Sequence, residues 1–396
     1  MKFFYIISIL VLVGLLIFFS REKFGDIRPA VIPANNLESQ ESTSSGDIVT
    51  SEEEVGFPLK TPEGYKISVF AKGVVSARDI EFAGDSLIVS QPAAGKISLL
   101  ADLDNNGTAE VIKDLITGLN RPHGIAFDNG KLFVAEETKI SRYNLDLQNQ
   151  TATLDKKLFD LPKGGRHFTR TIEFDRNGKM FVSLGSSCDV CIEKESFLAS
   201  VIVSDAEGSQ PRVYSKGLRN AVFLERRPDT DEIWATEMGR DFLGDDIPPD
   251  EINILKENVD FGWPNCYGDR IPDKRFNVRL NDASCAGSEL PAFNLQAHSA
   301  PLGLQFVEGG QFPANSQGDL LVSYHGSWNR STSTGYKVVK LNVENNKVTS
   351  QEDFITGFLD GSAAFGRPVD LEFDGKGSLY ISDDKAGSIY KVIFQK

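Results

Sequence analysis

The chain has 396 residues, of which 40% are hydrophobic, so it is long enough to bury one large core or two small ones. Its formal net charge of −14 at pH 7 argues against binding to a phosphate backbone, which needs clustered Lys and Arg. Nucleic acid is therefore not an expected partner.

Residues 1–20 form a hydrophobic N-terminal segment. Lys2 precedes an apolar run over residues 3–19, which is just long enough to span a membrane. Residues 18–20 fit a signal-peptide cleavage site poorly, so the sequence favours an uncleaved membrane anchor over a cleaved signal peptide. The charge on Lys2 would leave the remainder outside the cytoplasm, at the cell surface or in the periplasm.

The next segment, residues 21–56, is rich in Ser, Glu, Asn and Thr and has few aromatic residues. This composition is typical of a flexible linker that is too polar to fold alone. Folding is expected to begin at Phe57, because residues 65–69 alternate between apolar and polar side chains as a strand does. The folded domain is expected to span residues 57–396.

One pattern occurs six times in this domain: an apolar alternating strand, a turn of Asp, Asn or Gly, and a second strand rich in Leu, Val and Tyr. The copies begin at Arg78, His123, Arg170, Asn220, Pro301 and Arg367. Repeats of this size with hairpin turns are typical of propeller blades. The sequence therefore predicts an all-β, six-bladed β-propeller whose long insertions surround one mouth of the central channel, where a ligand should bind.

The segment ADLDNNGTAE, which starts at Ala101, is similar to the beginning of a calcium-binding loop. Lys113 stands where such a loop needs its closing Glu. We expect a hairpin turn between two strands here and assign no metal to it.

The chain contains four cysteines, and an even number in an exported protein suggests disulfides. A CxxC pair can also bind metal or carry redox chemistry, but there is no second CxxC and no thioredoxin-like context. We predict two structural disulfides, Cys188–Cys191 and Cys266–Cys285.

The segment from Gly217 to Gly268 is longer and more polar than a usual connection between strands. The adjacent Arg219 and Asn220 could hold a flat ligand that carries carboxylates, because a guanidinium binds a carboxylate as a two-pronged fork. The acidic loop that follows could offer oxygen atoms to calcium. A surface turn and a solvated acidic loop are the alternatives.

Several motifs together resemble the soluble sugar dehydrogenases that use pyrroloquinoline quinone (PQQ), close to their aldose and sorbosone dehydrogenase branch. The motifs are HFTRTIEFDRNGKMFVSLGSSCDVC, GLRNAVF, PPDEIN with FGWPN, HGSWNR with GYKVVKL, and GRPVDLEFDGKGSLYISDDKAGSIYKV. The resemblance covers about residues 58–396 and implies oxidation of an aldose or sugar aldehyde with PQQ and calcium. Because no CxxCH haem motif is present, electrons should pass to a separate acceptor.

The resemblance assigns His167 as the base that removes the hydroxyl proton while hydride passes to the quinone, a task that suits a neutral imidazole. Arg219 and Asn220 match the family's cofactor-binding pair. Gly239 and Arg240 fall where two backbone carbonyls bind calcium. Because this chain has extra residues between MGR and PPDEIN, Asp241, Asp245 and Asp246 are further candidate ligands.

Further candidates for holding the cofactor are His325, Arg330, Arg121 and Arg367. For Arg121 and Arg367, which stand at blade starts before Pro, a structural ion pair is the alternative. Glu308 stands where soluble glucose dehydrogenases place a Lys after the strand PLGLQF. An acid there would repel a cofactor carboxylate, so that contact must be lost or replaced by Arg330 or His325.

Two other classes of function stay open. One is a calcium-dependent propeller lactonase or other hydrolase, against which the several Arg at blade starts weigh. The other is a non-catalytic propeller that binds sugar or protein, which the departure at Glu308 keeps open.

Overall fold

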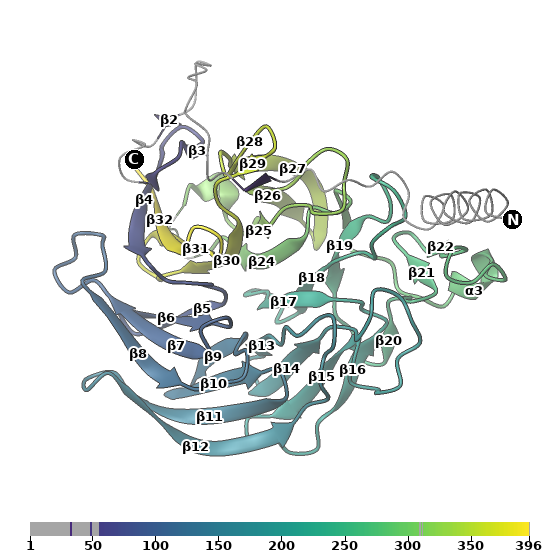
Figure 1. Ribbon diagram of the computed structural model, residues 1–396, viewed down its shortest axis with the longest axis horizontal. Helices are drawn as coiled ribbons and strands as arrows, with labels where there is room; N and C mark the ends of the chain where they lie inside the picture. Colours follow the sequence, from purple (N-terminus) through teal and green to yellow (C-terminus); the bar gives the residue numbers. More distant parts are fainter. Residues whose placement is uncertain (1–31, 34–47, 50–54, 309, 311, 396) are drawn as a thin grey trace, which may run out of the picture.

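The structure is a computed structural model that describes residues 32–33, 48–49, 55–308, 310 and 312–395. Six sheets stand around a central channel like the blades of a propeller, and they are antiparallel apart from one short parallel pairing at the outer edge of blade three (Figure 1). The predicted all-β, six-bladed β-propeller is confirmed, and its innermost strands begin at or within two residues of the six predicted repeat starts.

Each blade begins with its innermost strand and adds the following strands outward. Blade one contains β5 (Ile80–Ala83), β6 (Ser86–Gln91), β7 (Lys96–Ala101) and β8 (Val111–Thr117), and blade two contains β9 (Ile125–Asp128), β10 (Lys131–Glu136), β11 (Lys139–Asp146) and β12 (Thr151–Asp160). Blade three contains β13 (Ile172–Phe174), β14 (Lys179–Leu184), β15 (Ser200–Asp205), β16 (Arg212–Lys216) and the short β20 (Val259–Asp260). Blade four contains β17 (Ala221–Arg226), β18 (Ile233–Glu237), β19 (Asp250–Ile254) and β23 (Phe293–Leu295). Blade five contains β24 (Pro301–Phe306), β25 (Leu320–Tyr324), β26 (Lys337–Glu344) and β27 (Lys347–Ile355).

Blade six joins the two ends of the folded domain. It contains β30 (Pro368–Phe373), β31 (Ser378–Asp383), β32 (Ser388–Phe394) and, as its outermost strand, β4 (Tyr65–Lys72). The pairing of β4 with β32 is antiparallel and runs from Tyr65 opposite Phe394 to Lys72 opposite Ser388. The strand predicted over residues 65–69 is confirmed, and it closes the ring.

Apolar side chains between neighbouring blades form the core. Trp234 of blade four is fully buried and meets the Phe306 ring of blade five edge-on, with ring centroids 5.3 Å apart. Near the channel the innermost strands approach so closely that larger residues do not fit. A Cβ at Gly124 would lie 2.3 Å from the Arg170 carbonyl oxygen, and one at Gly303 would lie 2.6 Å from the Asp370 Cα.

Glutamates line the channel at the same position of several innermost strands. These positions hold Glu81, Glu173, Glu225 and Glu372, while Ala126 and Gln305 occupy the positions in blades two and five. Burial raises the pKa of all four carboxyls above the ordinary value, to about 7 for Glu173, and repulsion from the other ring members adds to it for Glu81, Glu225 and Glu372. Burial and mutual repulsion therefore favour the protonated form of these carboxyls.

Replacing Glu372 by Gln is expected to stabilise the protein more at pH 8 than at pH 5. The folded-state pKa of Glu372 lies above the unfolded value, so the stability that the carboxyl contributes at low pH is lost as the pH rises through the folded pKa. One pKa unit corresponds to about 1.4 kcal/mol, and we expect a gain on the order of 1 kcal/mol in urea unfolding at pH 8. Exposed Glu195→Gln is the control; equal pH dependence of Glu372→Gln and the parent would contradict this expectation.

Two short pieces of the expected linker lie against the propeller. β1 (Ile32–Pro33) pairs with β29 (Ala363–Ala364), and β2 (Ile48–Val49) pairs with β3 (Lys60–Thr61). β29 also pairs with β28 (Leu359–Asp360). The hydrophobic segment 1–20 lies outside the described residues, and within them no helix is long and apolar enough to cross a membrane.

The hairpin turn expected from ADLDNNGTAE is confirmed between β7 and β8. The carboxylates of Asp102, Asp104 and Glu110 lie within 4.8 Å of one another. They accept backbone N–H groups of the loop itself, including those of Leu103 and Asn106. The acids therefore stabilise the turn.

Both predicted disulfides are present. Cys188–Cys191 closes a short loop after β14, and Cys266–Cys285 joins β21 (Cys266–Tyr267) to α3 (Asp282–Cys285). β21, β22 (Ile271–Pro272) and α3 belong to an excursion that projects from the outside of the ring (Figure 1). A 3₁₀ turn, η1 (Ala314–Ser316), precedes β25.

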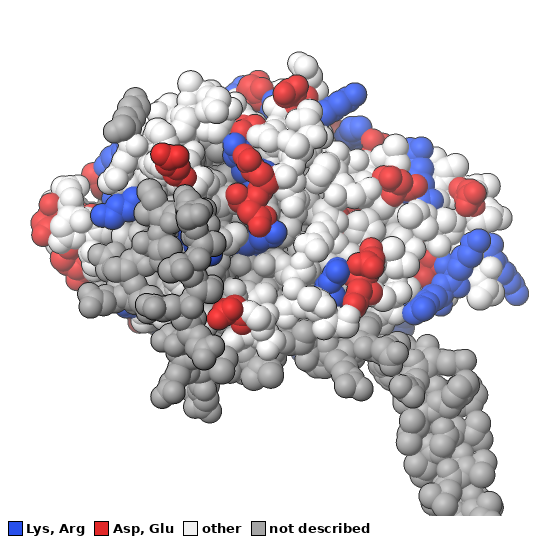
Figure 2. All heavy atoms as spheres, turned by 90° about the horizontal axis from the view of Figure 1, so that it is seen from above, with Lys and Arg blue, Asp and Glu red and all other residues white. Residues whose placement is uncertain are grey.

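Charged side chains are mixed on the surface. Figure 2 shows Lys and Arg singly or in small groups among Asp and Glu on the face in view. On this face the described basic residues do not form the broad positive field that a nucleic acid requires.

Candidate active site

One mouth of the channel receives five segments, because the strand directions bring them there. Residues 166–171 precede innermost strand β13, and residues 219–220 precede innermost strand β17. Residues 185–193 follow β14, residues 238–246 follow β18, and residues 325–330 follow β25. Each of these second strands runs antiparallel to its innermost neighbour, so it ends where that neighbour begins.

His167 is half-buried in this mouth. One of its ring nitrogens is hydrogen-bonded to the protein, and the other has no hydrogen-bond partner among the described residues. Nδ1 lies 3.0 Å from the Ser186 carbonyl oxygen and 2.9 Å from the Ser186 hydroxyl. The hydroxyl donates to the Cys188 carbonyl at 2.7 Å, so both Ser186 oxygens accept from Nδ1–H. Nε2 therefore carries the lone pair, and among the described residues it has no hydrogen-bond partner.

The environment of His167 keeps its imidazole neutral. Burial, Arg219 and Arg166 together lower its pKa to about 3. Gly185 makes room for the ring, because a Cβ there would lie 2.5 Å from both the His167 Cβ and the Asn220 Oδ1. The position can supply a neutral base across the physiological pH range.

Most N–H donors of the Arg219 guanidinium already bind protein acceptors, which the sequence alone does not indicate. Its Nε donates to the Asp189 carbonyl at 3.0 Å, Nη1 to the Met238 carbonyl at 3.2 Å, and Nη2 to the carboxylates of Asp189 at 2.7 Å and Asp241 at 3.2 Å. A guanidinium has five N–H donors, so one of them has no acceptor among the residues that the structure describes. The predicted two-pronged fork toward a ligand is wrong for this conformation, because protein acceptors already fill it.

Asn220 contacts the same site through its amide. Its Nδ2 reaches the Met238 sulfur at 3.5 Å, and its backbone N–H donates to Glu237 at 3.1 Å. Its Oδ1 lies 3.5 Å from the Thr169 hydroxyl and the residue is buried, so the amide is held among protein groups beside Arg219.

Asp241 lies in the site but balances cations. Its carboxylate accepts from Arg166 at 2.6 Å, from Arg219 at 3.2 Å and from Asn329 at 2.8 Å. Burial raises its pKa, and the two arginines oppose that shift. These three donors occupy the oxygens, so the expected metal role of Asp241 is not supported.

The backbone at Gly239 and Arg240 is better placed for a cation. Within the described part of the chain, no hydrogen-bond donor reaches either carbonyl. The Gly239 N–H donates to Asp250 at 2.9 Å, and the same carboxylate accepts from the Ala300 N–H at 2.9 Å. Asp250 of the PPDEIN motif thus fixes the segment at Gly239 to the start of blade five.

The remaining predicted residues surround the mouth in separate clusters. Arg121 stacks on Phe168, with its Cζ 3.4 Å from the ring centroid. His325 pairs with Asp384 at 2.9 Å, and Arg367 donates to the carbonyls of His325 and Gly326. Burial and Arg367 lower the pKa of His325 to about 4.

Arg330 anchors the acidic loop after β18. It donates to the Asp245 carbonyl at 2.6 Å and pairs with Asp246 at 3.1 Å. Arg330 and His325 are thus bound to protein groups, and their role in holding the cofactor stays a prediction.

The expected effect of Glu308 on a cofactor is wrong. Glu308 follows the end of β24, and with Arg227, which follows the end of β17, it lines a separate pocket. The innermost strands start at the His167 mouth, and a six-residue strand spans about 20 Å. Glu308 therefore lies at the opposite face, so it neither repels a ligand in the site nor argues for a non-catalytic protein.

Three functional neighbours were not predicted. Arg166 is 40% exposed and binds Asp241, and Asp189 binds Arg219 from within the CxxC loop. Trp328 of HGSWNR is 46% exposed, and its ring lies 5.7 Å from that of Phe242 and 5.8 Å from the Arg166 guanidinium. The position of Trp328 within a recognised motif was a signal that could have identified it.

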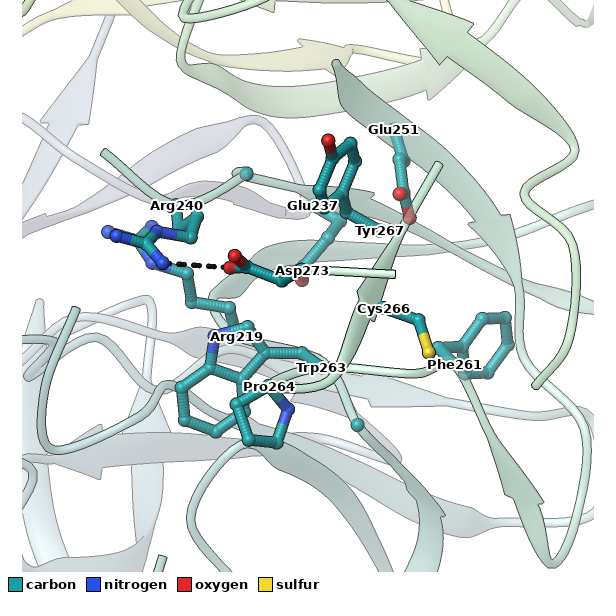
Figure 3. A pocket seen from close by; sticks show the side chains of 12 residues that line it. Arg219, Glu237, Arg240, Glu251, Phe261, Trp263, Pro264, Cys266, Tyr267 and Asp273 are labelled. Carbon is teal, nitrogen blue, oxygen red and sulfur yellow. Dashed lines mark hydrogen bonds and ion pairs between the residues drawn. The ribbon is translucent and has the colours of Figure 1, made fainter. Parts of the chain in front are cut away.

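A small cavity lies behind Arg219. Its walls include Glu237, Arg240, Trp263 and Asp273, and Asp273 points toward Arg240, which it binds at 2.8 Å (Figure 3). Its volume of about 20 Å³ is room for about one water molecule. His167 is not among its walls, so the mouth and not this cavity is the candidate site for an organic ligand.

Replacing Arg166 by Gln is expected to raise the pKa of His167. Arg166 is one of the cations that lower it, so removing this charge makes the imidazolium less costly and moves its titration to higher pH. NMR titration of the imidazole in the cofactor-free protein measures the midpoint. Exposed Arg176→Gln is the control, and an unshifted midpoint in Arg166→Gln would show that the Arg166 charge does not lower the pKa of His167.

Comparison with known proteins identifies the family of the chain. Residues 59–395 match the family described as TrAA12-like. An uncharacterized protein of Borreliella burgdorferi is 31% identical over 88% of this chain and 94% of its own length. A pyrroloquinoline quinone-dependent sugar dehydrogenase of Hypocrea jecorina is 22% identical over 88% of this chain and 93% of its own length. The calcium structure of Trichoderma reesei carbohydrate-active enzymes family AA12 has a TM-score of 0.73 at 21% identity and covers 92% of this chain and 100% of its own. The chain belongs to the TrAA12-like family, and its identification as a member of the PQQ-dependent sugar dehydrogenases, which are oxidoreductases, is confirmed.

Proposed function

We propose that the protein oxidises an aldose or similar sugar aldehyde with PQQ and calcium and passes the electrons to a separate acceptor. The observation that carries the proposal is the pairing of a neutral His167, whose Nε2 is open, with half-exposed arginines at the same mouth. The relatives named above support the cofactor and the metal.

The residues of the mouth fit a flat ligand with carboxylates. Arg166 is 40% exposed and Arg121 is 44% exposed, and each uses only one guanidinium nitrogen for an ion pair with a described residue. Arg219 adds an N–H that has no acceptor among the described residues, and Asn220 adds an amide whose Nδ2 contacts the weak acceptor sulfur of Met238. These donors around His167 would hold PQQ by its carboxylates.

Calcium fits the two free carbonyls of Gly239 and Arg240, since it prefers hard oxygen ligands. In this arrangement Asp241 and Asp189 neutralise the neighbouring arginines and contribute negative charge near the ion. When bound, PQQ supplies the acceptor of the hydride and calcium a Lewis acid.

The protein's own part in the chemistry is proton removal and positioning. His167 Nε2 accepts the proton of the sugar hydroxyl, while Ser186 holds Nδ1–H and so fixes the tautomer and the ring orientation. Trp328 and Phe242 present aromatic surface beside Arg166, against which the apolar face of a sugar ring can pack.

The experiment adds PQQ and calcium to purified protein and screens aldoses and lactones with an artificial dye as electron acceptor. Dye reduction with an aldose is the expected result. PQQ binding without dye reduction would overturn the proposed oxidation and favour a binding propeller, and lactone hydrolysis would favour the hydrolase.

The location outside the cytoplasm, with the N-terminal segment as a membrane anchor, is part of the same proposal. It rests on residues 1–20 of the sequence and on two disulfides, which form in oxidising compartments. Membrane fractionation and mass spectrometry of the N-terminus test it, and a mature protein that begins beyond Ser20 would overturn the anchor.

A further inference from the structure

We propose that the loop closed by Cys188–Cys191 is a common support of the base and the arginine of this site, with Ser186 and Asp189 as its positioning residues. The proposal rests on the proposed function. The loop comprises residues 186–193. It contacts His167 on one side and Arg219 on the other, and these contacts are the basis of the proposal.

The first contact is with the base. Besides the two Ser186 oxygens that receive Nδ1–H, the backbone of the loop pairs with the backbone of the histidine segment. The Arg166 N–H donates to the Ser187 carbonyl at 3.0 Å, and the His167 N–H lies 3.3 Å from the Ser186 carbonyl. Gly165 permits this approach, since a Cβ there would lie 2.7 Å from the Ser187 oxygen. A displacement of the loop therefore displaces His167.

The second contact is with the arginine. Asp189 lies between the two cysteines and binds Arg219 through both its carbonyl, at 3.0 Å, and its carboxylate, at 2.7 Å. The same carboxylate accepts the Asp241 N–H at 2.9 Å, which ties the loop to the segment after Arg240. Although burial opposes its ionisation, Arg219 and that N–H hold the pKa of Asp189 below its ordinary value.

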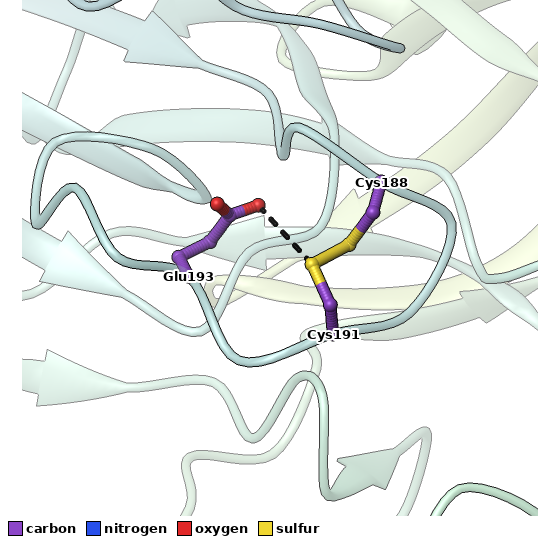
Figure 4. Close-up of side chains that lie close together, drawn as sticks. All are labelled: Cys188, Cys191 and Glu193. Atoms are coloured by element: carbon purple, nitrogen blue, oxygen red, sulfur yellow. Dashed lines mark hydrogen bonds between the residues drawn. A yellow bond between two sulfur atoms is a disulfide. The ribbon is translucent and has the colours of Figure 1, made fainter.

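The loop itself is short and internally braced. Ser187 donates to the Glu193 carboxylate from its N–H at 2.6 Å and from its hydroxyl at 2.8 Å. Figure 4 shows the Glu193 side chain directed at the Cys191 sulfur, beside the disulfide. With only Asp189 and Val190 between the bonded cysteines, the disulfide leaves Asp189 little freedom to leave Arg219.

The test compares two double variants, Cys188→Ser/Cys191→Ser and, as the matched control, Cys266→Ser/Cys285→Ser. Three quantities are measured in each: PQQ affinity in the presence of calcium, the His167 titration midpoint by NMR without cofactor, and the melting temperature. The first variant is expected to bind PQQ at least tenfold more weakly and to titrate His167 at higher pH, because the open loop admits water to the ring. The disulfide removed in the control closes a longer loop, with a sequence separation of 19 against 3. The control should therefore show the larger fall in melting temperature, while its PQQ affinity and its His167 midpoint stay nearer those of the parent.

Two single variants separate the two contacts. Asp189→Asn is expected to weaken PQQ binding, and Ser186→Ala is expected to lower the His167 midpoint, since the imidazolium loses one acceptor, while leaving PQQ affinity within a fewfold of the parent's. Tighter PQQ binding by Asp189→Asn would show that Asp189 competes with a ligand carboxylate and would overturn its positioning role. Parent-like affinity and midpoint in Cys188→Ser/Cys191→Ser would overturn the role of the disulfide.

The NMR readout keeps the outcome independent of the cofactor. If the parent protein does not bind PQQ, the proposed function fails, yet the midpoint of His167 still reports whether the loop holds the ring. A midpoint that moves in both double variants equally would mean general loosening of the fold and would also overturn the proposal.

Discussion

A His167→Ala variant should fold and bind PQQ like the parent and turn over sugar about 10²–10⁴-fold more slowly, the usual contribution of a positioned general base. The side chain lies half-buried in the mouth and leaves no core cavity, so the fold should tolerate its loss. Arg166, Arg121, Arg219 and Asn220 remain to hold the cofactor. Turnover with a dye acceptor and PQQ titration measure the two effects separately.

The pH profile distinguishes loss of a base from a general disturbance. In the parent, turnover should persist to acid pH and fall only as His167 takes up a proton, because burial, Arg219 and Arg166 lower its pKa to about 3. This acid limb should be absent in His167→Ala and in His167→Gln, which keeps an N–H donor for Ser186 but has no basic nitrogen.

Normal quinone binding with parent-like turnover and the same acid limb in His167→Ala would remove the assignment. The other histidines offer poorer replacements, because their nitrogens are engaged. His298 Nε2 donates to the Gly244 carbonyl at 2.8 Å, His325 Nε2 binds Asp384 at 2.9 Å, and His123 is fully buried.

An Arg219→Ala variant should lose both cofactor affinity and stability. The guanidinium is the shared partner of Asp189 and Asp241, and its removal leaves two largely buried carboxylates short of a counter-ion. Breaking a buried pair in this way costs about 3–5 kcal/mol, and we expect the lower end because Arg166 still pairs with Asp241. PQQ affinity should fall by about 2–3 kcal/mol through the lost charge and N–H donor.

Urea unfolding and PQQ titration measure these two losses, with Arg219→Lys as the conservative control. Lys keeps the charge, but its ammonium group lacks the planar fork with which Arg219 binds both the carbonyl and the carboxylate of Asp189. It should therefore recover more of the stability than of the affinity. If Arg219→Ala binds PQQ as the parent does, Arg219 is a structural ion-pair partner alone.

The sequence predicts those parts of the molecule that depend on neighbouring residues. The six blades follow from strand and turn patterns that repeat within about 15 residues, and both disulfides join cysteines that are near in sequence. The assignment of His167 as the base came from the resemblance of its motif, HFTRTIEF, to the dehydrogenase family, and it stays a prediction. Its tautomer could not be predicted, since Ser186, which fixes it, follows the next hairpin strand.

Contacts between distant loops are beyond the reach of such patterns. The carboxylates that fill the Arg219 fork come from positions 30 residues before it and 22 residues after it. Glu308 was misplaced for a related reason. Counting residues past β24 identifies a position in the chain, but only the direction of that strand shows which face of the propeller it reaches.

The pairing of β4 with β32 has a consequence for how the ring is made during synthesis. Tyr65 leaves the ribosome more than 300 residues before its partner Phe394, so β4 must wait for nearly the entire chain to be translated. Until then Ile67 and Phe70, both buried in the finished blade, lie on a strand whose edge is open to pairing with other chains. Closure therefore comes after the other blades have been synthesised, and removing β32 should release β4 as well and produce aggregation instead of a five-bladed protein.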